Sequence, residues 1–322
     1  MFFLVFSLTA NAQKNMRVAF WNLENLYDTI NDPNVNDEEF LPSAKNKWNS
    51  EKYLTKLNNL SKVILEINPD IIGFAEVENK AVLNDLTQKT ALQKQGYSIV
   101  HYDSPDQRGI DVAMIYKKKS FRVLDSKSIR VELPGDSAYP TRDILLVKGV
   151  LSKKDTLFIM INHWPSRRGG TNESEEKRIY AAAKLKQITD SIYKLNSNAQ
   201  FLAMGDFNDE PTDKSLQSLN CKNISQGACF INKMDSIKAS GDGTHYYKKE
   251  KNVLDQILVS AAFNEKKTYY AATAYIFKPE WIFAEVYKND GLSPKRTYAG
   301  SRYIGGYSDH LPVYMELIYA KQ

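Results

Sequence analysis

Several features of membrane, repeat and multidomain proteins are absent from this sequence. Its 322 residues contain no apolar stretch of eighteen residues, no internal repeat and no linker rich in proline, glycine or serine. A transmembrane helix needs about 20 apolar residues, so no stable insertion into a membrane is predicted. Without a linker, the simplest interpretation is one domain from residue 13 to residue 322. With 43% hydrophobic residues, a chain of this length can bury a large core.

Strong charge and abundant cysteine are missing too. The net charge of +5 permits an anionic substrate but does not by itself indicate nucleic-acid binding. The only cysteines are Cys221 and Cys229, in a loop-like stretch. Because no histidine or further cysteine is near them, they do not predict a zinc site. A local disulfide, which fits an oxidising compartment, and two unpaired thiols both remain open.

The first twelve residues predict an export signal. An apolar run over residues 2–8 precedes Ala10 and Ala12, which fit the small-residue pattern of a cleavage site. The positively charged start of such signals is missing, since the first basic residue is Lys14. A start further upstream or an apolar first strand are the alternatives. We predict cleavage near Ala12 and export of the mature protein to the periplasm or the extracellular space.

Strand patterns outnumber helical ones. Leu57, Leu60 and Ile64 share one face of a predicted helix that begins at Asn49 or Ser50. The predicted strands cover residues 17–21, 70–76, 97–102, 111–116, 121–131, 144–151, 156–162, 200–204, 254–260, 269–276 and 313–318, and the predicted helices cover residues 49–67, 80–95 and 173–195.

Eleven strands with three helices are too much sheet for a single covered layer. Residues 111–162 are strand after strand without a helix, which favours antiparallel pairing. We therefore predict an α/β sandwich: two mixed, mainly antiparallel sheets packed face to face, with helices outside.

Polar, chemically capable residues recur where the predicted strands end. Six such sites contribute Asn22, Glu24, Glu76, His163, Asp206, Asn208, Asp255, Asp309 and His310. Any one of these motifs is often only a turn, as Asp206 and Asn208 alone would suggest. Their recurrence at successive strand ends favours a catalytic site presented by a rigid scaffold. A set rich in oxygen suits a hard divalent cation and phosphate chemistry better than zinc or a redox metal.

In identity and order these motifs resemble the endonuclease/exonuclease/phosphatase superfamily, which shares the deoxyribonuclease I-like fold. The match extends from residue 17 to residue 313. The resemblance implies a four-layer α/β sandwich in a catalytic domain over residues 13–322. It also implies hydrolysis of a phosphoester that depends on Mg²⁺, or on Mn²⁺ in some members. The substrate stays open, because the superfamily includes nucleases, inositol-phosphate phosphatases and sphingomyelinases.

The resemblance also implies a metal site and a group around the attacking water. Glu76 is expected as the main metal ligand, with Glu24 and Asp309 beside it and Asn22 orienting a water or a phosphate oxygen. Asp206 and Asn208 are expected to contact the attacking water and a non-bridging oxygen.

Two histidines are expected to act on the phosphate. His310, held by Asp255, matches the superfamily's histidine–aspartate pair and would serve as a base or as a phosphate-binding cation. His163 would donate to the phosphate or protonate the leaving oxygen, with Asp111 as its supporting carboxylate. Ser166 falls where nuclease members often have a polar phosphate ligand. His101 and His245 are interpreted as isolated and structural or exposed.

Basic and aromatic residues on nearby loops predict a substrate-binding rim. Arg167 and Arg168 follow His163, while Arg296, Tyr298 and Tyr303 precede the last motif. Charged loops are often only solvated surface. The functional interpretation is phosphate binding with rings for base stacking. Other basic residues that could join this rim are Arg142, Lys177, Arg178, Lys295 and Arg302.

The sequence thus predicts an exported, Mg²⁺-dependent phosphodiesterase, in the first place a nuclease for DNA or RNA. A phosphatase or a phospholipid phosphodiesterase on the same scaffold is the alternative. A third hypothesis is a binding module that has lost catalysis. The predicted partner is nucleic acid or another phosphoester substrate, and no protein partner is evident.

Overall fold

The computed structural model describes residues 15–133, 140–151, 155–224, 226–247, 249–263, 269–288 and 290–319. The predicted signal peptide, residues 1–12, lies outside the described residues. Among the described helices, none combines the length and the apolar character needed to cross a membrane.

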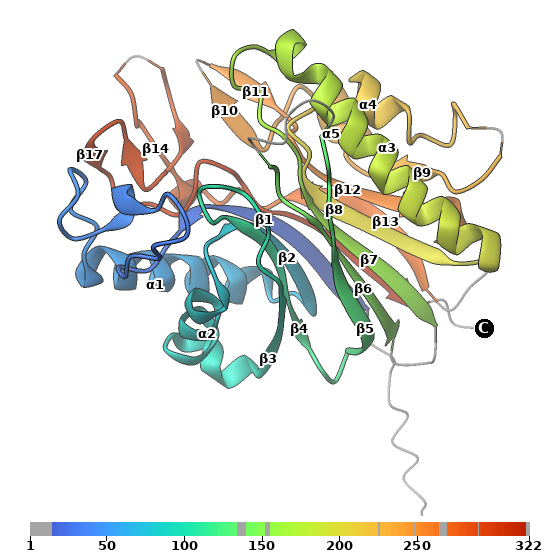
Figure 1. The fold of residues 1–322 in the computed structure, drawn as a ribbon, viewed down its shortest axis with the longest axis horizontal. Coiled ribbons are helices and arrows are strands. Elements are labelled where there is room, and N and C mark those ends of the chain that lie inside the picture. Colours follow the sequence, from blue (N-terminus) through green and yellow to red (C-terminus); the bar gives the residue numbers. More distant parts are fainter. Residues whose placement is uncertain are drawn as a thin grey trace, which may run out of the picture.

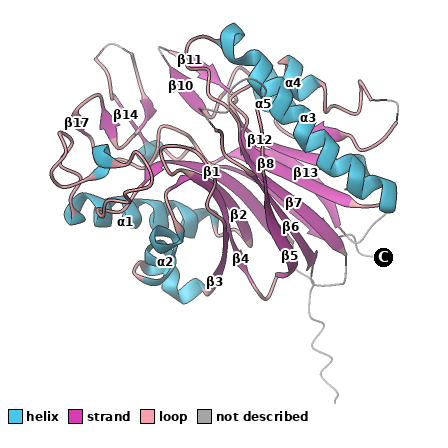
Figure 2. Ribbon diagram, viewed as in Figure 1, coloured by secondary structure: helices cyan, strands magenta, loops and turns pink. Residues whose placement is uncertain are grey.

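Two six-stranded sheets form the centre of the molecule (Figures 1 and 2). The first sheet has the order β13-β18-β1-β2-β4-β3, with β1 Met16–Leu26, β2 Ile71–Val77, β3 Tyr97–His101, β4 Asp111–Lys117, β13 Tyr269–Ile276 and β18 Val313–Tyr319. The second has the order β5-β6-β7-β8-β12-β9, with β5 Phe121–Ile129, β6 Ile144–Leu151, β7 Thr156–His163, β8 Gln200–Asp206, β9 Phe230–Asn232 and β12 Asp255–Ser260.

Helices cover the outer faces of this sandwich. The helices are α1 Ser50–Ile67, α2 Lys80–Gln88, α3 Thr171–Leu195, α4 Lys214–Gln217 and α5 Asp235–Ala239, with 3₁₀ turns at Glu38–Phe40, Ala91–Gln95, Ala261–Phe263 and Glu280–Ile282. Figure 1 shows α1 and α2 on the side of the first sheet and α3 on the side of the second. The predicted four-layer α/β sandwich is therefore confirmed.

Three short hairpins stand at one end of the sandwich. They pair β10 His245–Tyr247 with β11 Glu250–Asn252, β14 Phe283–Ala284 with β15 Ser293–Pro294, and β16 Tyr298–Ala299 with β17 Arg302–Tyr303. Strands of two or three residues are too short for a periodic pattern, so the sequence did not predict them.

The helix boundaries follow from capping. Asn49 accepts a hydrogen bond from Lys52 N and begins α1, and Asn68 in the left-handed conformation ends it. The helix predicted over residues 80–95 is α2 followed by a separate 3₁₀ turn, because Thr90 caps Leu92 N and starts the turn anew. A disulfide joins Cys221 and Cys229, which settles the alternative that the sequence left open.

Three apolar layers hold the sandwich together. Val18 and Phe20 of the first sheet meet Ile159, Ile161 and Leu202 of the second, all without exposed surface. Separate clusters lie under α1 and α2 and under α3. Burying one such side chain fully is worth about 1.5–3 kcal/mol. The two sheets approach so closely that a Cβ on Gly73 would lie 2.6 Å from Cδ1 of Ile161.

Strand direction gathers the motifs at one edge. Among the pairs of the two large sheets, β1 with β2 and β7 with β8 are parallel, and the others are antiparallel. The carboxyl ends of the four parallel strands therefore meet the amino ends of β4, β12 and β18. This edge carries the predicted catalytic residues.

Candidate active site

Asp206 is at the centre of the site. It is the last residue of β8 and is almost fully buried. Its Oδ2 accepts a hydrogen bond from Asn22 Nδ2 at 3.0 Å and lies 3.7 Å from His163 Nε2 and 3.8 Å from His310 Nε2. Its Oδ1 accepts from Asn208 N at 2.9 Å. Burial raises the pKa of Asp206 to about 7, so this carboxylate is poised to exchange a proton near neutral pH.

The glycine before Asp206 lets the two parallel strands close up. A Cβ on Gly205 would lie 2.3 Å from the carbonyl oxygen of Asn162 on β7. Only a residue without a side chain fits there.

His310 and Asp255 form the second part of the site. Asp255 begins β12 directly opposite Asp206, and its Oδ2 lies 2.7 Å from His310 Nδ1. Burial alone lowers the pKa of His310, but Asp255 and Asp206 outweigh it and hold the pKa well above its usual value. A protonated imidazole donates from both nitrogens, so Nε2–H points toward the Asp206 side. Thr244 Oγ1 accepts from Asp255 N at 3.1 Å and fixes the start of the strand.

His163 lies across the site at the end of β7. Its Nε2 is 3.9 Å from Oε1 of Glu76 as well as 3.7 Å from Asp206. Burial lowers the pKa of His163 well below its usual value, and the charges of Arg142 and Arg108 add to the effect. The imidazole is therefore neutral. Its Nδ1 is buried without a hydrogen-bond partner among the described residues.

Asp111 is not the supporting carboxylate of His163, which corrects the prediction. Its Oδ2 lies 2.9 Å from His101 Nε2, and its Oδ1 accepts from Ser104 N at 2.7 Å. The reason is sheet order: β4 pairs with β3, so Asp111 faces the end of that strand and not β7. The interpretation of His101 as isolated is wrong for the same reason.

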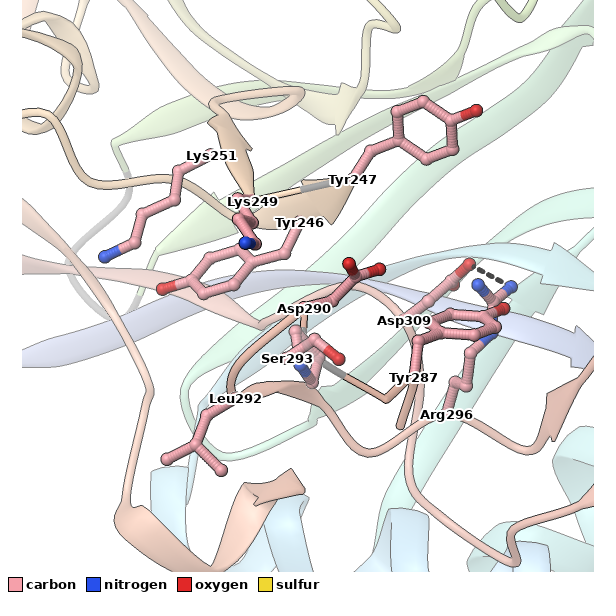
Figure 3. Close-up of a pocket in the computed structure, with 11 residues that line it drawn as sticks. Tyr246, Tyr247, Lys249, Lys251, Tyr287, Asp290, Leu292, Ser293, Arg296 and Asp309 are labelled. Carbon is pink, nitrogen blue, oxygen red and sulfur yellow. Dashed lines mark hydrogen bonds and ion pairs between the residues drawn. The ribbon is translucent and has the colours of Figure 1, made fainter. Parts of the chain in front are cut away.

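The carboxylates of the predicted metal site surround two cations. Arg296 donates from Nη2 to Asp309 at 2.8 Å (Figure 3). It also donates from Nε to Glu24 at 3.1 Å, so its guanidinium joins these two acids. Buried Lys56 lies 3.8 Å from Glu24. Burial and the neighbouring Asp309 raise the pKa of Glu24 to about 7. Arg296 is thus paired with the acidic residues Glu24 and Asp309 and is not a free substrate-binding side chain.

Backbone strain marks the same residues. Glu24, Asn25, Glu76 and Asn208 all have φ between 50° and 61°, a region that non-glycine residues rarely adopt. Each such residue costs on the order of 1–3 kcal/mol and persists only where its surroundings hold it. Glu76 is held because its Oε2 accepts from Asn25 N at 2.9 Å. Strain of this kind gathers at functional sites, and here it aims the acids at the cleft.

The predicted metal ligands are of the chemical type that a hard divalent cation prefers. Glu76, Glu24 and Asp309 supply anionic oxygens, and no described residue donates a hydrogen bond to Oε1 of Glu76. Asn22 is committed elsewhere: its Oδ1 accepts from Glu24 N, and its Nδ2 donates to Asp206. Asn22 therefore positions two acids.

A cation at this site must share Glu24 and Asp309 with Arg296. Three groups of described residues hold their potential ligand atoms within 4.8 Å of one another: His245, Asp309 and His310; His101, Asp103 and Asp111; and Asp206, Asp255 and His310. Neither Glu24 nor Glu76 belongs to any of them, so the predicted ligands converge less tightly than the acids and histidines beside them.

A basic cavity of about 450 Å³ is lined by Pro165 and Ser166, which follow His163 in the chain. Ser166 and Arg168 line it as predicted, together with Arg108, Thr141, Arg142 and Lys177. Burial raises the pKa of Asp106, but Arg142 and Arg108 outweigh it and hold the pKa below its usual 3.8.

Arg142 is the buried cation of this cavity. It lies 3.1 Å from Asp106 and donates to Trp164 O at 2.6 Å, while its Nε has no hydrogen-bond partner among the described residues. The cavity is therefore suited to an anion.

Several predicted rim residues have other positions. Arg167 donates to Asn208 O at 2.7 Å and to Asp213 at 2.9 Å, so it supports the Asn208 loop. Arg178 is fully buried against Asp209 and cannot reach substrate. Both assignments to an open rim are therefore wrong in their geometry.

The predicted stacking rings also lie elsewhere. The rings of Tyr298 and Tyr303 are 5.3 Å apart and pack beside α1, with Lys52 Nζ 4.8 Å from the second ring. Neither lines the cavities next to the histidines. Stacking of substrate on these rings beside the catalytic edge does not fit the structure.

His245 is a site neighbour that the sequence interpretation missed. Its ring centroid lies 4.7 Å from that of His310, and the two residues form an isolated antiparallel bridge. Burial and the charge of His310 lower the pKa of His245 to about 4, so it is neutral. In the sequence, the one indication that His245 belongs to the site is its position ten residues before Asp255. That spacing is too long for a short sequence motif.

Comparisons with known proteins agree with this geometry. The sequence profile described as "Endonuclease/Exonuclease/phosphatase family" matches residues 17–319, so the chain belongs to this family. Endonucleases, exonucleases and phosphatases all hydrolyse phosphate esters, which places the chain among phosphoester hydrolases. A search of curated proteins finds no match.

Solved structures share the fold at low sequence identity. The human Nocturnin catalytic domain, with bound sulfate anion, is 18% identical with a TM-score of 0.58, and 95% of each chain is covered. An endonuclease/exonuclease/phosphatase family protein from Bacteroides thetaiotaomicron is 14% identical with a TM-score of 0.60, over 96% of this chain and 99% of that one. Truncated Caenorhabditis elegans TDP2 is 15% identical with a TM-score of 0.57, over 95% and 98%.

Proposed function

We propose that the protein is an exported, Mg²⁺- or Mn²⁺-dependent phosphodiesterase that acts as a nuclease. The observation that carries the proposal is the position of Asp206. One buried carboxylate oxygen faces two imidazoles at 3.7 and 3.8 Å and is oriented by an amide at 3.0 Å. An acid in that position is suited to take a proton from a water molecule attacking a phosphate between the histidines.

The other residues have matching roles. The water oxygen attacks phosphorus, its proton passes to Asp206, and the ester bond to the leaving oxygen breaks. His310, held by Asp255, donates from Nε2 to a phosphate oxygen and stabilises the charge that develops there. Asn208 Nδ2 donates to Trp164 O at 3.0 Å, so its side chain holds the β7 and β8 loops together and sets the distance between His163 and Asp206.

Glu76, Glu24 and Asp309 would hold the divalent cation. When bound, Mg²⁺ offsets the charge of a phosphate and stabilises a leaving oxygen. Arg296 and Lys56 already neutralise part of this acidic group, which favours one bound cation over a cluster.

The basic cavity supports a polyanionic substrate. Ser166, Arg168, Arg142 and Lys177 line this cavity, and its wall includes the residues that follow His163, so it offers a place for a phosphate next to the cleaved one. Export is supported by the cleavage pattern before Gln13 and by the disulfide, which fits an oxidising compartment.

The test uses protein that begins at Gln13, with single-stranded DNA, RNA and supercoiled plasmid as substrates. We expect cleavage with Mg²⁺ or Mn²⁺, none with EDTA, and a loss of about 10²–10⁴-fold in His310→Ala. His101→Ala is the matched control, since it removes another buried imidazole that contacts an acid away from Asp206.

The outcomes separate the hypotheses. Equal cleavage by the wild-type and His310→Ala proteins would indicate a contaminating nuclease and overturn the proposal. If all nucleic acids stay intact while phosphate is released from a monoester, or a phospholipid is cleaved, the protein is a phosphatase or phospholipid phosphodiesterase. If nothing is hydrolysed, the catalytically inactive binding module becomes the better hypothesis.

A further inference from the structure

A second cavity opens from the other side of the active site. It measures about 420 Å³, and Arg296 and Asp309 form part of its wall (Figure 3). Asp309 is a predicted metal ligand, and Arg296 pairs with both Asp309 and Glu24. A molecule in the cavity therefore lies next to the predicted metal ligands. The size suits one small molecule or one monomer of a polymer, since ligand cavities typically measure about 300–1,000 Å³.

Two segments far apart in the sequence build this cavity. Tyr246, Tyr247 and Lys251 come from the β10–β11 hairpin. Tyr287 and Leu292 come from the loop that joins β14 to β15. Neither segment belongs to the two large sheets, so the cavity is an addition to the scaffold and is not needed for its core.

Exposed apolar side chains are concentrated here. Tyr247, Tyr287 and Leu292 are 58%, 42% and 67% exposed, and all three line the cavity. Contact of apolar surface with water is unfavourable, so the gathering of these side chains at one concave place indicates a binding site. Tyrosine rings offer flat faces for another ring.

Cations accompany the rings. Lys249, Lys251 and Arg296 all line the cavity. Lys251 Nζ lies 5.2 Å from the centre of the Tyr246 ring and 3.8 Å from Asp242. Lys249 forms no ion pair within the described part of the chain, and it occupies the hairpin turn with φ of 70°. An ammonium without an ion-pair partner in the described part of the chain, in the wall of a cavity lined by tyrosines, suits an anionic group on a ring-bearing ligand.

We propose that this tyrosine–lysine cavity binds one unpaired nucleoside unit of the substrate, with its base against the tyrosines. The inference rests on the proposed function and names its substrate class. A nucleoside seated here leaves its phosphate beside Asp309 and Arg296, next to the reacting group, and a further phosphate near Lys249. Because the cavity has room for a single unit, a paired base cannot enter. The substrate class is therefore single-stranded ends, unpaired stretches and small nucleotide esters, and not intact duplex.

The decisive experiment compares two esters that release the same leaving group. Thymidine 5′-(4-nitrophenyl phosphate) and methyl 4-nitrophenyl phosphate differ only in the nucleoside. We expect wild-type protein with Mg²⁺ to prefer the nucleoside ester in kcat/KM. Tyr287→Ala should lower the ratio of the two kcat/KM values by about five- to hundredfold, the range that loss of one base–aromatic stack gives.

Tyr270→Ala is the matched control. Tyr270 is 45% exposed, close to Tyr287, but it lies on β13 where that strand pairs with Ile318, away from the catalytic edge. This variant should keep the wild-type ratio. A wild-type ratio near one, or an equal fall of both rates in Tyr287→Ala, would overturn the inference while leaving phosphodiester hydrolysis intact.

A binding measurement decides the matter if neither ester is hydrolysed. Thymidine 5′-monophosphate and deoxyribose 5-phosphate are titrated calorimetrically into the wild-type, Tyr287→Ala and Lys249→Ala proteins. Tighter binding of the base-bearing ligand, lost in Tyr287→Ala and weakened in Lys249→Ala, supports the cavity even though the proposed function has failed. Equal binding of the two ligands would refute the cavity's role.

Discussion

The buried ion pair between Arg178 and Asp209 offers the sharpest test of how the site loop is held. Arg178 Nε lies 2.6 Å from Asp209 Oδ1 as a close ion pair without hydrogen-bond alignment. Arg178 also donates to Ser174 Oγ at 2.6 Å and to Thr171 O at 2.9 Å, while Asp209 accepts from Ser215 Oγ at 2.6 Å. The pair ties α3 to the residue that follows Asn208.

Replacing Asp209 by Asn leaves the charge of Arg178 buried and uncompensated. Removing one partner of such a pair costs about 3–5 kcal/mol of unfolding free energy. At about 2–4 °C per kcal/mol, the thermal midpoint should fall by about 6–20 °C. Burial raises the pKa of Asp209 although Ser215 and Arg178 act to lower it. The unfavourable desolvation of this carboxylate therefore outweighs the favourable interactions with these two partners. The double variant Arg178→Met/Asp209→Leu should therefore be less destabilised than Asp209→Asn.

Thermal and urea unfolding check this reasoning. Lys214→Ala is the control, because the ion pair of Lys214 with Glu175 joins the same helix α3 but is exposed. It should leave the midpoint unchanged. The reasoning is refuted if Asp209→Asn shifts the midpoint no more than Lys214→Ala, or if the double variant is the less stable of the two.

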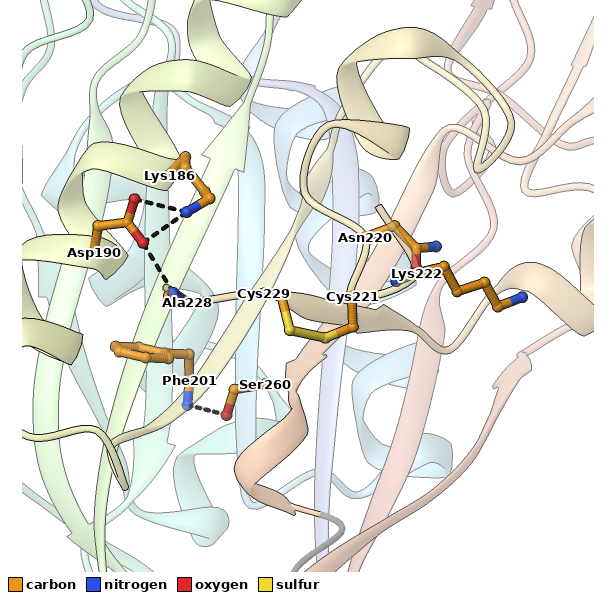
Figure 4. Close-up of a disulfide and its surroundings, with 9 residues drawn as sticks. All are labelled: Lys186, Asp190, Phe201, Asn220, Cys221, Lys222, Ala228, Cys229 and Ser260. Atoms are coloured by element: carbon orange, nitrogen blue, oxygen red, sulfur yellow. Dashed lines mark hydrogen bonds and ion pairs between the residues drawn. A yellow bond between two sulfur atoms is a disulfide. The ribbon is translucent and has the colours of Figure 1, made fainter. Parts of the chain in front are cut away.

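Three further predictions concern catalysis, pH and the disulfide. Asp255→Asn should lower kcat by about 10²–10⁴-fold, as measured by steady-state kinetics. Asp106→Asn leaves the charge of the buried Arg142 without its partner. The free energy of unfolding at pH 7 should fall by about 3–5 kcal/mol, as measured by urea unfolding. The neighbouring arginines depress the pKa of Asp106, so its contribution is present above the usual pKa of 3.8 and is lost as pH falls through the lower pKa of the folded protein. Figure 4 shows the disulfide between Cys221 and Cys229. Replacing both cysteines by Ser should lower the free energy of unfolding by about 2–3 kcal/mol.

Each of these has a clear contrary result. Full activity of Asp255→Asn would remove the histidine–aspartate pair from the mechanism. A stability deficit of Asp106→Asn that persists unchanged down to pH 2 would show that the ion pair is not its cause. Identical urea midpoints for the oxidised wild type and the double serine variant would mean that the disulfide does not constrain the unfolded chain.

The strand framework could be predicted because each strand carries its own evidence. All eleven predicted strands are present, since alternating or continuous apolar runs report burial directly. The main catalytic residues could be placed because they end these strands. Asp206, His163 and His310 meet as expected once the parallel pairs are known.

What the sequence could not reveal depends on partners far along the chain. Arg168 lines a cavity while Arg178, ten residues on, is buried, because only the second meets Asp209. The partner of Asp111 depended on which strand lies beside β4, which no local pattern states. Whether the cysteines are bridged depended likewise on the course of the loop between α4 and β9.

The close contact between the two sheets has a consequence for rate as well as for stability. Glu76 and Asn22 belong to one sheet and His163 and Asp206 to the other, so the reacting groups are anchored in two separate bodies. Their spacing therefore depends on how the two sheets pack on each other, and the sheets are in close contact at Gly73, where an added Cβ would meet Ile161. Changes of volume deep between the sheets should alter turnover at a distance, whereas equal changes beneath the helices should alter stability alone.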